Sequence, residues 1–400
     1  MSRIRIALVF GTRPEAVKLL PVILLLRADE RFDVRVIVTG QHRTMLEEIL
    51  TPFGVVPDVD LAIMQPAQSL NDIAARVIPR LDELFATLAP RLVLVQGDTT
   101  SAFCAALVAF QRRVAVGHVE AGLRSFDRQH PYPEEVNRRM IGALADVHFA
   151  PTRRAADCLA AEGAPADSVF VTGNTGVDAL LLALRRADDG AAPAFGAGGG
   201  GRRLVLVTLH RREAWDGVNA AGENVLAGIL DGIRRSAVHH PDVDFVYPVH
   251  LNPRVRGQAE QVMAGVANVH LVAPVPYLPF VHLMARAAAI VTDSGGIQEE
   301  APSLGVSVLI ARKTTERPEA LASRTNRLVG TEAADIEREI NAVLAQAAPP
   351  NPSRALASPR PNPFGDGRAS ERIRDGVLCF LGLGARPANL EAEEAAPGAA

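Results

Sequence analysis

Acidic side chains follow apolar segments in the first half of the chain, where they could support acid–base chemistry. Asp98 comes two residues after the apolar run at 92–96, and Glu120 comes two residues after the run at 114–118. Glu134 lies in the segment PYPEEVNRR, where a proline marks the start of a helix. Because the carboxyl ends of parallel strands meet at one edge of a sheet, we expect these carboxylates to lie together. Crowded carboxylates can provide a proton donor and a proton acceptor in one site.

Each of these acidic residues also has a simpler explanation. Asp98 could cap the N-terminus of a helix, and Glu120 could be an ion-pair partner in a loop. Glu134 and Arg138 are four residues apart on the expected helix, and they could form a surface pair of small energetic value. The combination of three carboxylates at one edge of a sheet is harder to explain in this way.

The stretch TDSGGIQEE at residues 292–300 predicts a phosphate site in the second half of the chain. An apolar run precedes it, so a strand should end at a tight turn that opens a helix, where backbone N–H groups and the positive helix end converge. The residues of this turn are Ser294, Gly295 and Gly296. Glu300 follows on the first turn of the helix, where its carboxylate could bind sugar hydroxyls. Alternatively, the turn is an ordinary helix start capped by Asp293 or Ser294.

Basic residues at other expected strand ends could bind a diphosphate. His210 follows the run at 204–208, and Arg317 lies in the segment TTERPE. Such cations stabilise a diphosphate, and they would help it to depart as a leaving group. His250 follows the run at 243–249, but a structural histidine is an alternative at this position.

Lysine is rare in this chain. Of 42 basic residues, only Lys18 and Lys313 are lysines. Where arginine is the usual cation, a lysine can mark a site that requires a compact ammonium group. The alternative is chance retention on an exposed helix face.

Composition excludes several classes of protein. A net charge of −3 provides no basic surface for nucleic acid, and no apolar run approaches the roughly 20 residues of a membrane span.

The segment GTRPEAVK at 11–18 lacks the G-x-G-x-x-G spacing of dinucleotide sites, which disfavours a nicotinamide enzyme. No cluster has metal-ligand spacing, so we expect neither a metal nor a cofactor. Three cysteines (Cys104, Cys158 and Cys379) and the absence of a signal peptide predict a cytoplasmic location.

The alternation of β-branched runs with helix-length segments predicts an α/β fold with two doubly wound, Rossmann-like domains. The strands expected in the first sheet are residues 4–10, 34–38, 92–96, 114–118 and 147–150. Those expected in the second are residues 204–208, 243–249, 269–272, 290–293 and 306–310.

The expected domains are residues 1–180 and 181–365. Within the second, the Gly-rich segment 190–201 should be flexible. Residues 366–384 should contain a last helix at 369–381, and the tail at 385–400, rich in Ala, Glu and Pro, should be disordered.

Taken in order, these motifs resemble the non-hydrolysing UDP-N-acetylglucosamine 2-epimerases. The resemblance extends from the first strand to the segment NPFGDG at 362–367. The motifs that carry it lie at residues 11–18, 40–43, 96–101, 118–125, 132–138, 210–213, 293–304 and 314–319.

The resemblance implies the glycosyltransferase B architecture, an active site in the interdomain cleft, a final helix that returns to the first domain, and a homodimer. It also implies interconversion of UDP-GlcNAc and UDP-ManNAc for cell-surface polysaccharide synthesis. In that reaction UDP is eliminated across C1 and C2 to leave a 2-acetamidoglucal, and it then adds back with C2 protonated on the other face.

Family positions map onto residues of this chain. The catalytic positions match Lys18, Asp98, Glu120, Glu134, Arg138 and His210. The UDP-binding positions match Arg13, Phe280, Ser294, Gly295, Gly296, Glu300 and Arg317. A second, activating UDP-GlcNAc site of the family would involve Gln41, His42, Arg211 and His250. Thr44 departs from the glutamine associated with that site, and Val275-Pro276 departs from the Gln-Asp often found near the uracil.

Three other functions remain open on these residues. A glycosyltransferase of the same fold would require an acceptor, and it would not exchange the C2 proton. A hydrolysing relative would release ManNAc and UDP. A nucleotide-sugar sensor would bind UDP-GlcNAc without turnover.

Overall fold

Short β-branched runs form the strands of two parallel sheets in the computed structural model. The structure describes residues 3–40, 43–65, 68–186, 202–211, 215, 217–218, 224–323, 325–346 and 361–391. The expected flexible segment at 190–201 lies outside these residues. The chain divides into an N-terminal unit, Met1–Ala179 with Phe364–Ala392, and a C-terminal unit that contains Leu180–Pro363.

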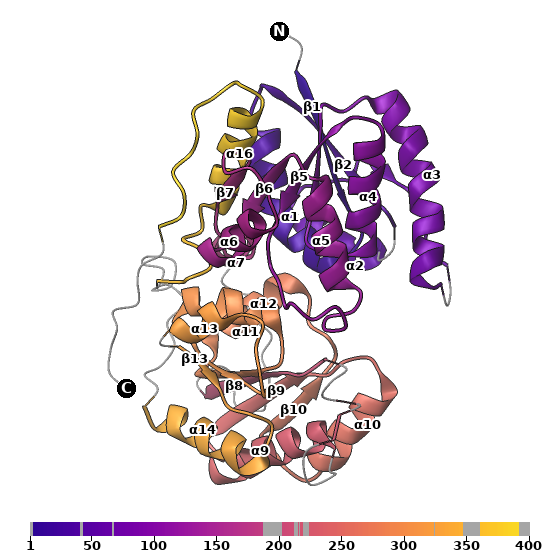
Figure 1. Ribbon diagram of the computed structural model, residues 1–400. Coiled ribbons are helices and arrows are strands. Elements are labelled where there is room, and N and C mark those ends of the chain that lie inside the picture. Colours follow the sequence, from indigo (N-terminus) through magenta and orange to yellow (C-terminus); the bar gives the residue numbers. More distant parts are fainter. Residues whose placement is uncertain are drawn as a thin grey trace. The chain divides into compact units, whose positions relative to one another are not determined.

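The sheet of the N-terminal unit has seven parallel strands in the order β3-β2-β1-β4-β5-β6-β7. They are β1 (Ile4–Phe10), β2 (Phe32–Val38), β3 (Val59–Asp60), β4 (Leu92–Gln96), β5 (Ala115–Val119), β6 (Val147–Ala150) and β7 (Val169–Val171). The helices are α1 (Arg13–Arg27), α2 (Arg43–Leu50), α3 (Leu70–Leu88), α4 (Thr100–Gln111), α5 (Glu134–Leu144), α6 (Arg153–Ala161), the start of α7 (Thr175–Arg186) and α16 (Ala369–Phe380). Apolar side chains of α3, α4 and α5 form one core with β1, β4 and β5. Helices α1 and α16 pack together elsewhere in the unit (Figure 1).

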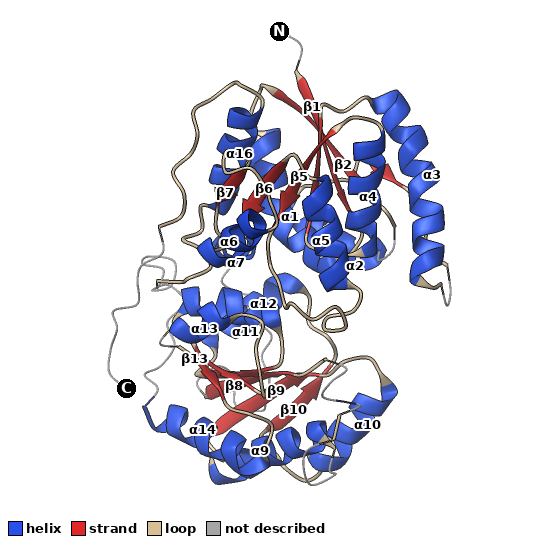
Figure 2. Ribbon diagram, viewed as in Figure 1, coloured by secondary structure: helices blue, strands red, loops and turns tan. Residues whose placement is uncertain are grey.

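The sheet of the C-terminal unit has six parallel strands in the order β10-β9-β8-β11-β12-β13. They are β8 (Arg203–Thr208), β9 (Val243–Pro248), β10 (Val269–Val272), β11 (Ala289–Thr292), β12 (Ser307–Ile310) and β13 (Asn326–Leu328). The helices are α9 (Val225–His239), α10 (Pro253–Val262), α11 (Tyr277–Arg286), α12 (Gly295–Glu300), α13 (Pro318–Ala322) and α14 (Ala333–Gln346). Figure 2 shows helices on both faces of this sheet, with α9 and α14 on one and α11 and α12 on the other.

The predicted fold class, with two parallel sheets and interleaved helices, is confirmed. Each of the ten predicted strands is present within two residues of its expected bounds. The sequence missed β3, β7 and β13, which have only two or three residues each. Runs of that length contain too few residues to establish a two-residue period.

The C-terminal part of the chain returns to the N-terminal unit. Helix α16 packs against α1, β6 and β7. A Cβ atom on Gly376 would lie 2.8 Å from Cε1 of Phe149, so the absence of a side chain permits this close approach. Beyond the helix, the backbone N–H of Leu390 donates to the carbonyl of Val171 at 2.7 Å.

Arg386 and Leu390, which lie in the segment expected to be a disordered tail, contact the N-terminal unit. The guanidinium of Arg386 lies 4.3 Å from the centre of the Phe170 ring and donates to the backbone carbonyl of Asp167. Residues 392–400 lie outside the described residues. The sequence did not indicate these contacts because the segment itself is poor in apolar residues. It is held instead by the edge of β7 and by the ring of Phe170.

No helix in the described part of the chain has the length and apolarity to cross a membrane.

Candidate active site

Asp98 and Arg138 form an ion pair at the carboxyl end of β4. Gly97 has a φ of +69°, which turns the chain after the strand and presents Asp98 at the sheet edge. Nε of Arg138 donates to Oδ2 of Asp98 at 3.1 Å, and Nη2 donates to the same oxygen. Thr99, rather than Asp98, caps α4, because its hydroxyl accepts the N–H of Ala102 at 3.0 Å. Asp98 is therefore not the cap of this helix.

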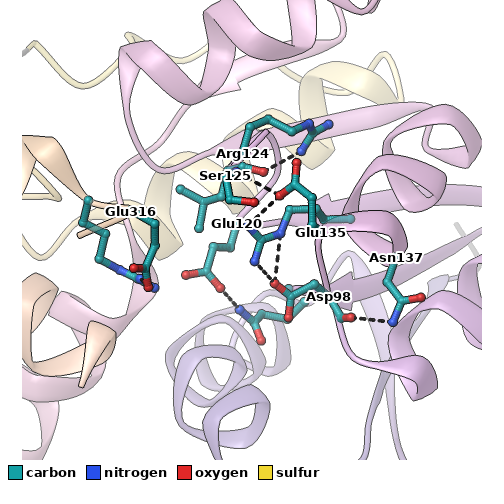
Figure 3. A network of polar contacts seen from close by, with 12 residues as sticks. Asp98, Glu120, Arg124, Ser125, Glu135, Asn137 and Glu316 are labelled. Carbon is teal, nitrogen blue, oxygen red and sulfur yellow. Dashed lines mark hydrogen bonds and ion pairs between the residues drawn. The ribbon is translucent and has the colours of Figure 1, made fainter. Parts of the chain in front are cut away.

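Glu135 is a second partner of Arg138 that the sequence analysis did not identify. Nη1 of Arg138 donates to Oε2 of Glu135 at 3.3 Å, whereas the sequence paired Arg138 with Glu134. Glu135 is buried and also accepts the backbone N–H of Ser125 at 2.9 Å (Figure 3). The spacing of three residues between Glu135 and Arg138 was the signal that could have found this pair.

The arginine remains charged in this environment. Burial would lower the pKa of Arg138, but the carboxylates of Asp98 and Glu135 outweigh it and raise that pKa above its ordinary value. Asn137, the preceding residue on α5, donates its amide to the carbonyl oxygen of Asp98 at 2.9 Å. Helix α5 thus holds both the backbone and the side chain of Asp98.

Glu120 and Lys18 form another ion pair among the predicted catalytic residues. The ammonium of Lys18 donates to Oε1 of Glu120, and the two side chains are only 12% and 8% exposed. The amide of Gln96, the last residue of β4, donates to Oε2 of Glu120. Asn174 donates to Oε1 at 3.0 Å. The lysine that stood out by composition therefore binds one of the predicted catalytic carboxylates.

Glu15 joins the loop after β1 to the loop after β4. Its Oε2 accepts the N–H groups of Gly11 and Thr12 at 3.0 and 2.7 Å, and its Oε1 accepts the hydroxyl of Thr99 at 2.8 Å. Burial raises the pKa of Glu15, although these hydrogen bonds act in the opposite direction. Arg13, a predicted UDP ligand, follows this loop as the first residue of α1.

His118 supports the turn that carries Asp98. Its Nε2 lies 2.7 Å from the carbonyl oxygen of Gly97. Burial lowers the pKa of His118 to about 3, so the ring is neutral and Nε2–H donates this bond. The adjacent His148 on β6 also has a pKa lowered by burial, to about 4.

Asp293 organises the predicted diphosphate side in the C-terminal unit. Its carboxylate is buried at the end of β11 and accepts the backbone N–H groups of His210 and Arg211 at 3.0 and 2.9 Å. The imidazole of His210 is 47% exposed, with Nδ1 3.7 Å from Oδ1 of Asp293. Asp293 is therefore not a helix cap, and it positions the loop after β8.

The Ser-Gly-Gly turn opens α12, as the sequence predicted. The N–H of Ser294 donates to the hydroxyl of Thr292 at 2.9 Å, which sets the direction of the chain as it leaves β11. A Cβ atom on Gly296 would lie 3.7 Å from Oε1 of Glu300, so that carboxylate leans back towards the start of the helix. Phe280, another predicted UDP residue, is partly buried on α11.

Three arginines surround Glu316 in the same unit. Arg211 and Arg312 donate to its carboxylate at 2.7 Å, and Arg317 donates at 2.5 Å. Nε of Arg317 also donates to the buried Glu299 at 2.5 Å. Burial would raise the pKa of Glu316, but the three guanidinium groups hold it well below its ordinary value. This cluster fixes the guanidinium groups, and the sequence analysis identified only Arg317 and Arg211 in it.

Arg211 and His250, two residues of the predicted second site, contact different residues: Arg211 binds Glu316, and His250 contacts Asn252 and Trp215. Nδ1 of His250 accepts the N–H of Asn252 at 3.1 Å, and its ring centre lies 4.8 Å from that of Trp215. Burial and the nearby His210 lower the pKa of His250. Gln41 and His42 lie outside the described residues.

The remaining predicted residue, Glu134, is the first residue of α5 and is partly buried. Among the described residues, no group of three or more His, Cys, Asp and Glu side chains could hold a metal ion.

Two α/β units, each with a parallel sheet, have the fold of the glycosyltransferase B class. One unit has ion-paired carboxylates at its strand ends, and the other has clustered arginines beside a Ser-Gly-Gly turn. A sucrose-phosphate synthase from Thermosynechococcus elongatus shares the fold, with a TM-score of 0.54 at 13% identity over 95% of this chain and 97% of the other.

The family model described as UDP-N-acetylglucosamine 2-epimerase matches residues 25–378. A UDP-N-acetylglucosamine 2-epimerase from Bacillus subtilis (strain 168) is 44% identical over 382 residues, which cover 96% of this chain and 97% of the relative. The enzyme of that name from Escherichia coli (strain K12) is 43% identical over 379 residues, or 93% and 98% of the two chains. The crystal structure of the Neisseria meningitidis UDP-GlcNAc 2-epimerase bound to UDP-GlcNAc has a TM-score of 0.83, at 41% identity over 94% of this chain and 100% of the other.

The chain belongs to the UDP-N-acetylglucosamine 2-epimerase family, and it is an isomerase. The family resemblance seen in the sequence is therefore confirmed.

Proposed function

We propose that this enzyme interconverts UDP-GlcNAc and UDP-ManNAc by eliminating UDP and adding it back. The observation that carries the proposal is the pair of ion pairs at neighbouring strand ends, Asp98 with Arg138 and Glu120 with Lys18. Inversion at C2 requires a group that removes a proton from one face of the sugar and a group that delivers a proton to the other. Carboxylates held in fixed positions by cations meet this requirement.

The first half of the reaction breaks two bonds. A base of the N-terminal unit takes the C2 proton, and the C2–H electron pair forms the C1–C2 double bond. The C1–O bond breaks at the same time, and UDP leaves with the C1–O electron pair. We assign the base and acid roles to Asp98, Glu120 and Glu134 as a group, with Lys18 and Arg138 as their charged partners. In the second half, UDP attacks C1 of the 2-acetamidoglucal while C2 receives a proton on the opposite face.

The C-terminal unit would stabilise the departing diphosphate. Fixed cations and N–H donors aimed at a leaving group lower the barrier because they do not have to reorganise as charge develops. In our proposal the diphosphate binds at Ser294, Gly295 and Gly296, and Glu300 binds the ribose. The remaining ligands would be Arg13, His210, Phe280 and Arg317.

Incubation with UDP-GlcNAc in deuterated water tests the proposal. We expect UDP-ManNAc labelled with deuterium at C2, measured by NMR and mass spectrometry, with UDP-GlcNAc labelled in parallel. Absence of both the epimer and the exchange would refute an epimerase. Stoichiometric accumulation of free UDP would instead indicate the hydrolysing reaction, and transfer that depends on an added acceptor would indicate a glycosyltransferase.

Three further parts of the proposal concern the setting of the reaction. We propose a homodimer, which light scattering of the purified protein would test. We also propose that Arg211, His250, Gln41 and His42 contribute to a second UDP-GlcNAc site, which would make the UDP-ManNAc to UDP-GlcNAc rate depend on added UDP-GlcNAc. We further propose that the enzyme acts in the cytoplasm and supplies UDP-ManNAc for cell-surface polysaccharide synthesis. Deletion of the gene would then deplete UDP-ManNAc in cells.

A further inference from the structure

We infer that Asn174 is a positioning residue for Glu120. The inference rests on the proposed function, because it assigns a role in that reaction to a side chain outside the motifs from which the catalytic residues were identified. Asn174 lies in the turn between β7 and α7, and it is 2% exposed.

The orientation of the Asn174 amide is fixed by its two ends. The N–H of Gly176 donates to Oδ1 at 2.9 Å, so this oxygen marks the acceptor end of the amide. The other end is therefore the Nδ2 donor, which lies 3.0 Å from Oε1 of Glu120. A flipped amide would lose both hydrogen bonds, and it would place an oxygen against a carboxylate.

Glu120 needs such support because its backbone is in an uncommon conformation. Its φ is +65°, a left-handed value that carries a conformational penalty for a residue with a side chain. The carboxylate is then held by Lys18 from α1, by Gln96 from β4 and by Asn174. Donors from three separate elements restrict both the position and the rotation of the carboxylate.

The returning C-terminal segment holds Asn174 in turn. The backbone N–H of Asn174 donates to the carbonyl of Phe364 at 2.6 Å, and Phe364 is buried. At Gly173, where φ is +89°, a Cβ atom would lie 3.3 Å from Cα of Gly365. The turn and the segment therefore meet backbone to backbone, which leaves Asn174 little freedom to move away from Glu120.

Removal of the donor should act on catalysis more than on substrate binding. Without Nδ2 the Glu120 carboxylate keeps Lys18 and Gln96, but it can rotate about the remaining bonds. We expect Asn174→Ala to lower kcat roughly 10- to 100-fold, with KM changed far less, because a misplaced catalytic group affects the transition state most.

The Asn174→Asp variant provides the sharper test. Aspartate has the shape of asparagine and can still accept from Gly176, but it places a second carboxyl group beside Glu120. Two carboxyl groups at this distance share a proton, and only the protonated aspartic acid can donate as Asn174 does. Its kcat relative to wild type should therefore rise as the pH falls from 8 to 5, whereas the ratio for Asn174→Ala should stay flat.

Asn268→Ala is the matched control. The Asn268 amide donates to the carbonyls of Ala237, His240 and Val243 at 2.7 to 3.0 Å, so its role is to hold backbone. Its removal should lower the Tm and leave kcat unchanged.

The outcomes separate this inference from the proposed function. A wild-type protein without C2 exchange would refute the proposed function itself. With an active wild type, wild-type kcat in both Asn174 variants would overturn the inference. A pH-independent kcat ratio for Asn174→Asp would also overturn it, because a purely structural role would lower activity equally at every pH.

Discussion

A Cβ atom added to Gly295 would lie 2.4 Å from Nη1 of Arg317. This distance is shorter than any normal contact, and the guanidinium cannot retreat easily because Glu299 and Glu316 both bind it. The glycine at the start of α12 thus makes room for a cation as well as for a turn.

Gly295→Ala should therefore displace Arg317 and weaken UDP binding. We expect the Kd for UDP, measured by calorimetric titration, to rise roughly 10- to 100-fold, because charge-assisted hydrogen bonds depend strongly on geometry. Gly257→Ala on α10 is the control, since a Cβ atom there meets nothing within 4 Å. That variant should bind UDP normally and gain up to about 1 kcal/mol in stability from helix propensity. Equal Kd values for both variants would contradict this prediction.

Neutralisation of the three predicted catalytic carboxylates should separate catalysis from binding. We expect Asp98→Asn, Glu120→Gln and Glu134→Gln each to lower kcat by about 10²- to 10⁴-fold, because each loses a proton-transfer group or its electrostatic support. UDP affinity should remain near that of wild type. Deuterium exchange at C2 and calorimetric titration with UDP measure the two properties, and wild-type turnover in a variant would exclude its residue from the proton transfers.

Arg138→Lys tests whether the fork of the guanidinium is required. Arg138 binds Asp98 and Glu135 at the same time, and a lysine ammonium cannot reproduce that planar geometry. We expect the free energy of unfolding to fall by about 1–3 kcal/mol, and kcat to fall by roughly 10²-fold as Asp98 loses its fixed position. Arg139, whose side chain is 54% exposed, is the neighbouring control. Arg139→Lys should change stability by no more than about 0.5 kcal/mol.

Asp178 should make stability depend on pH between about 4 and 6. Burial raises its pKa from 3.8 to about 6, although the N–H groups of Ser370 and Ala369 at the start of α16 donate to its carboxylate. Because the pKa is higher in the folded state, the contribution of this group is full below pH 3.8 and is lost as the pH rises through 6. The loss amounts to roughly 3 kcal/mol.

Urea unfolding of wild type and Asp178→Asn at pH 4 and pH 7 measures this effect. The variant cannot titrate at residue 178, so it does not lose this contribution as the pH rises. From pH 4 to pH 7, the unfolding free energy of wild type should therefore fall by roughly 3 kcal/mol relative to that of the variant. The same pH dependence in both proteins would mean that Asp178 titrates normally.

The sequence predicts strands and catalytic candidates where neighbouring residues of the chain carry the signal. Strand bounds such as Leu92–Gln96 follow from runs of β-branched and apolar residues, and catalytic candidates such as Asp98 follow from their place at the end of such a run. Lys18 stood out because lysine is nearly absent from the chain. These inferences use only neighbouring residues and composition.

The partners of those residues were decided by the tertiary structure. Asn174 lies 54 positions from Glu120, and Gly295 lies 22 positions from Arg317, so no local pattern links either pair. The same holds for Glu15, which joins two loops that are distant in sequence. The sequence by itself determined the fold class, the family resemblance and the catalytic candidates, because strand periodicity and motif order are local properties. The donors that hold each carboxylate, and the glycine that admits Arg317, depend on contacts between distant segments, which form only when the strands of each sheet align.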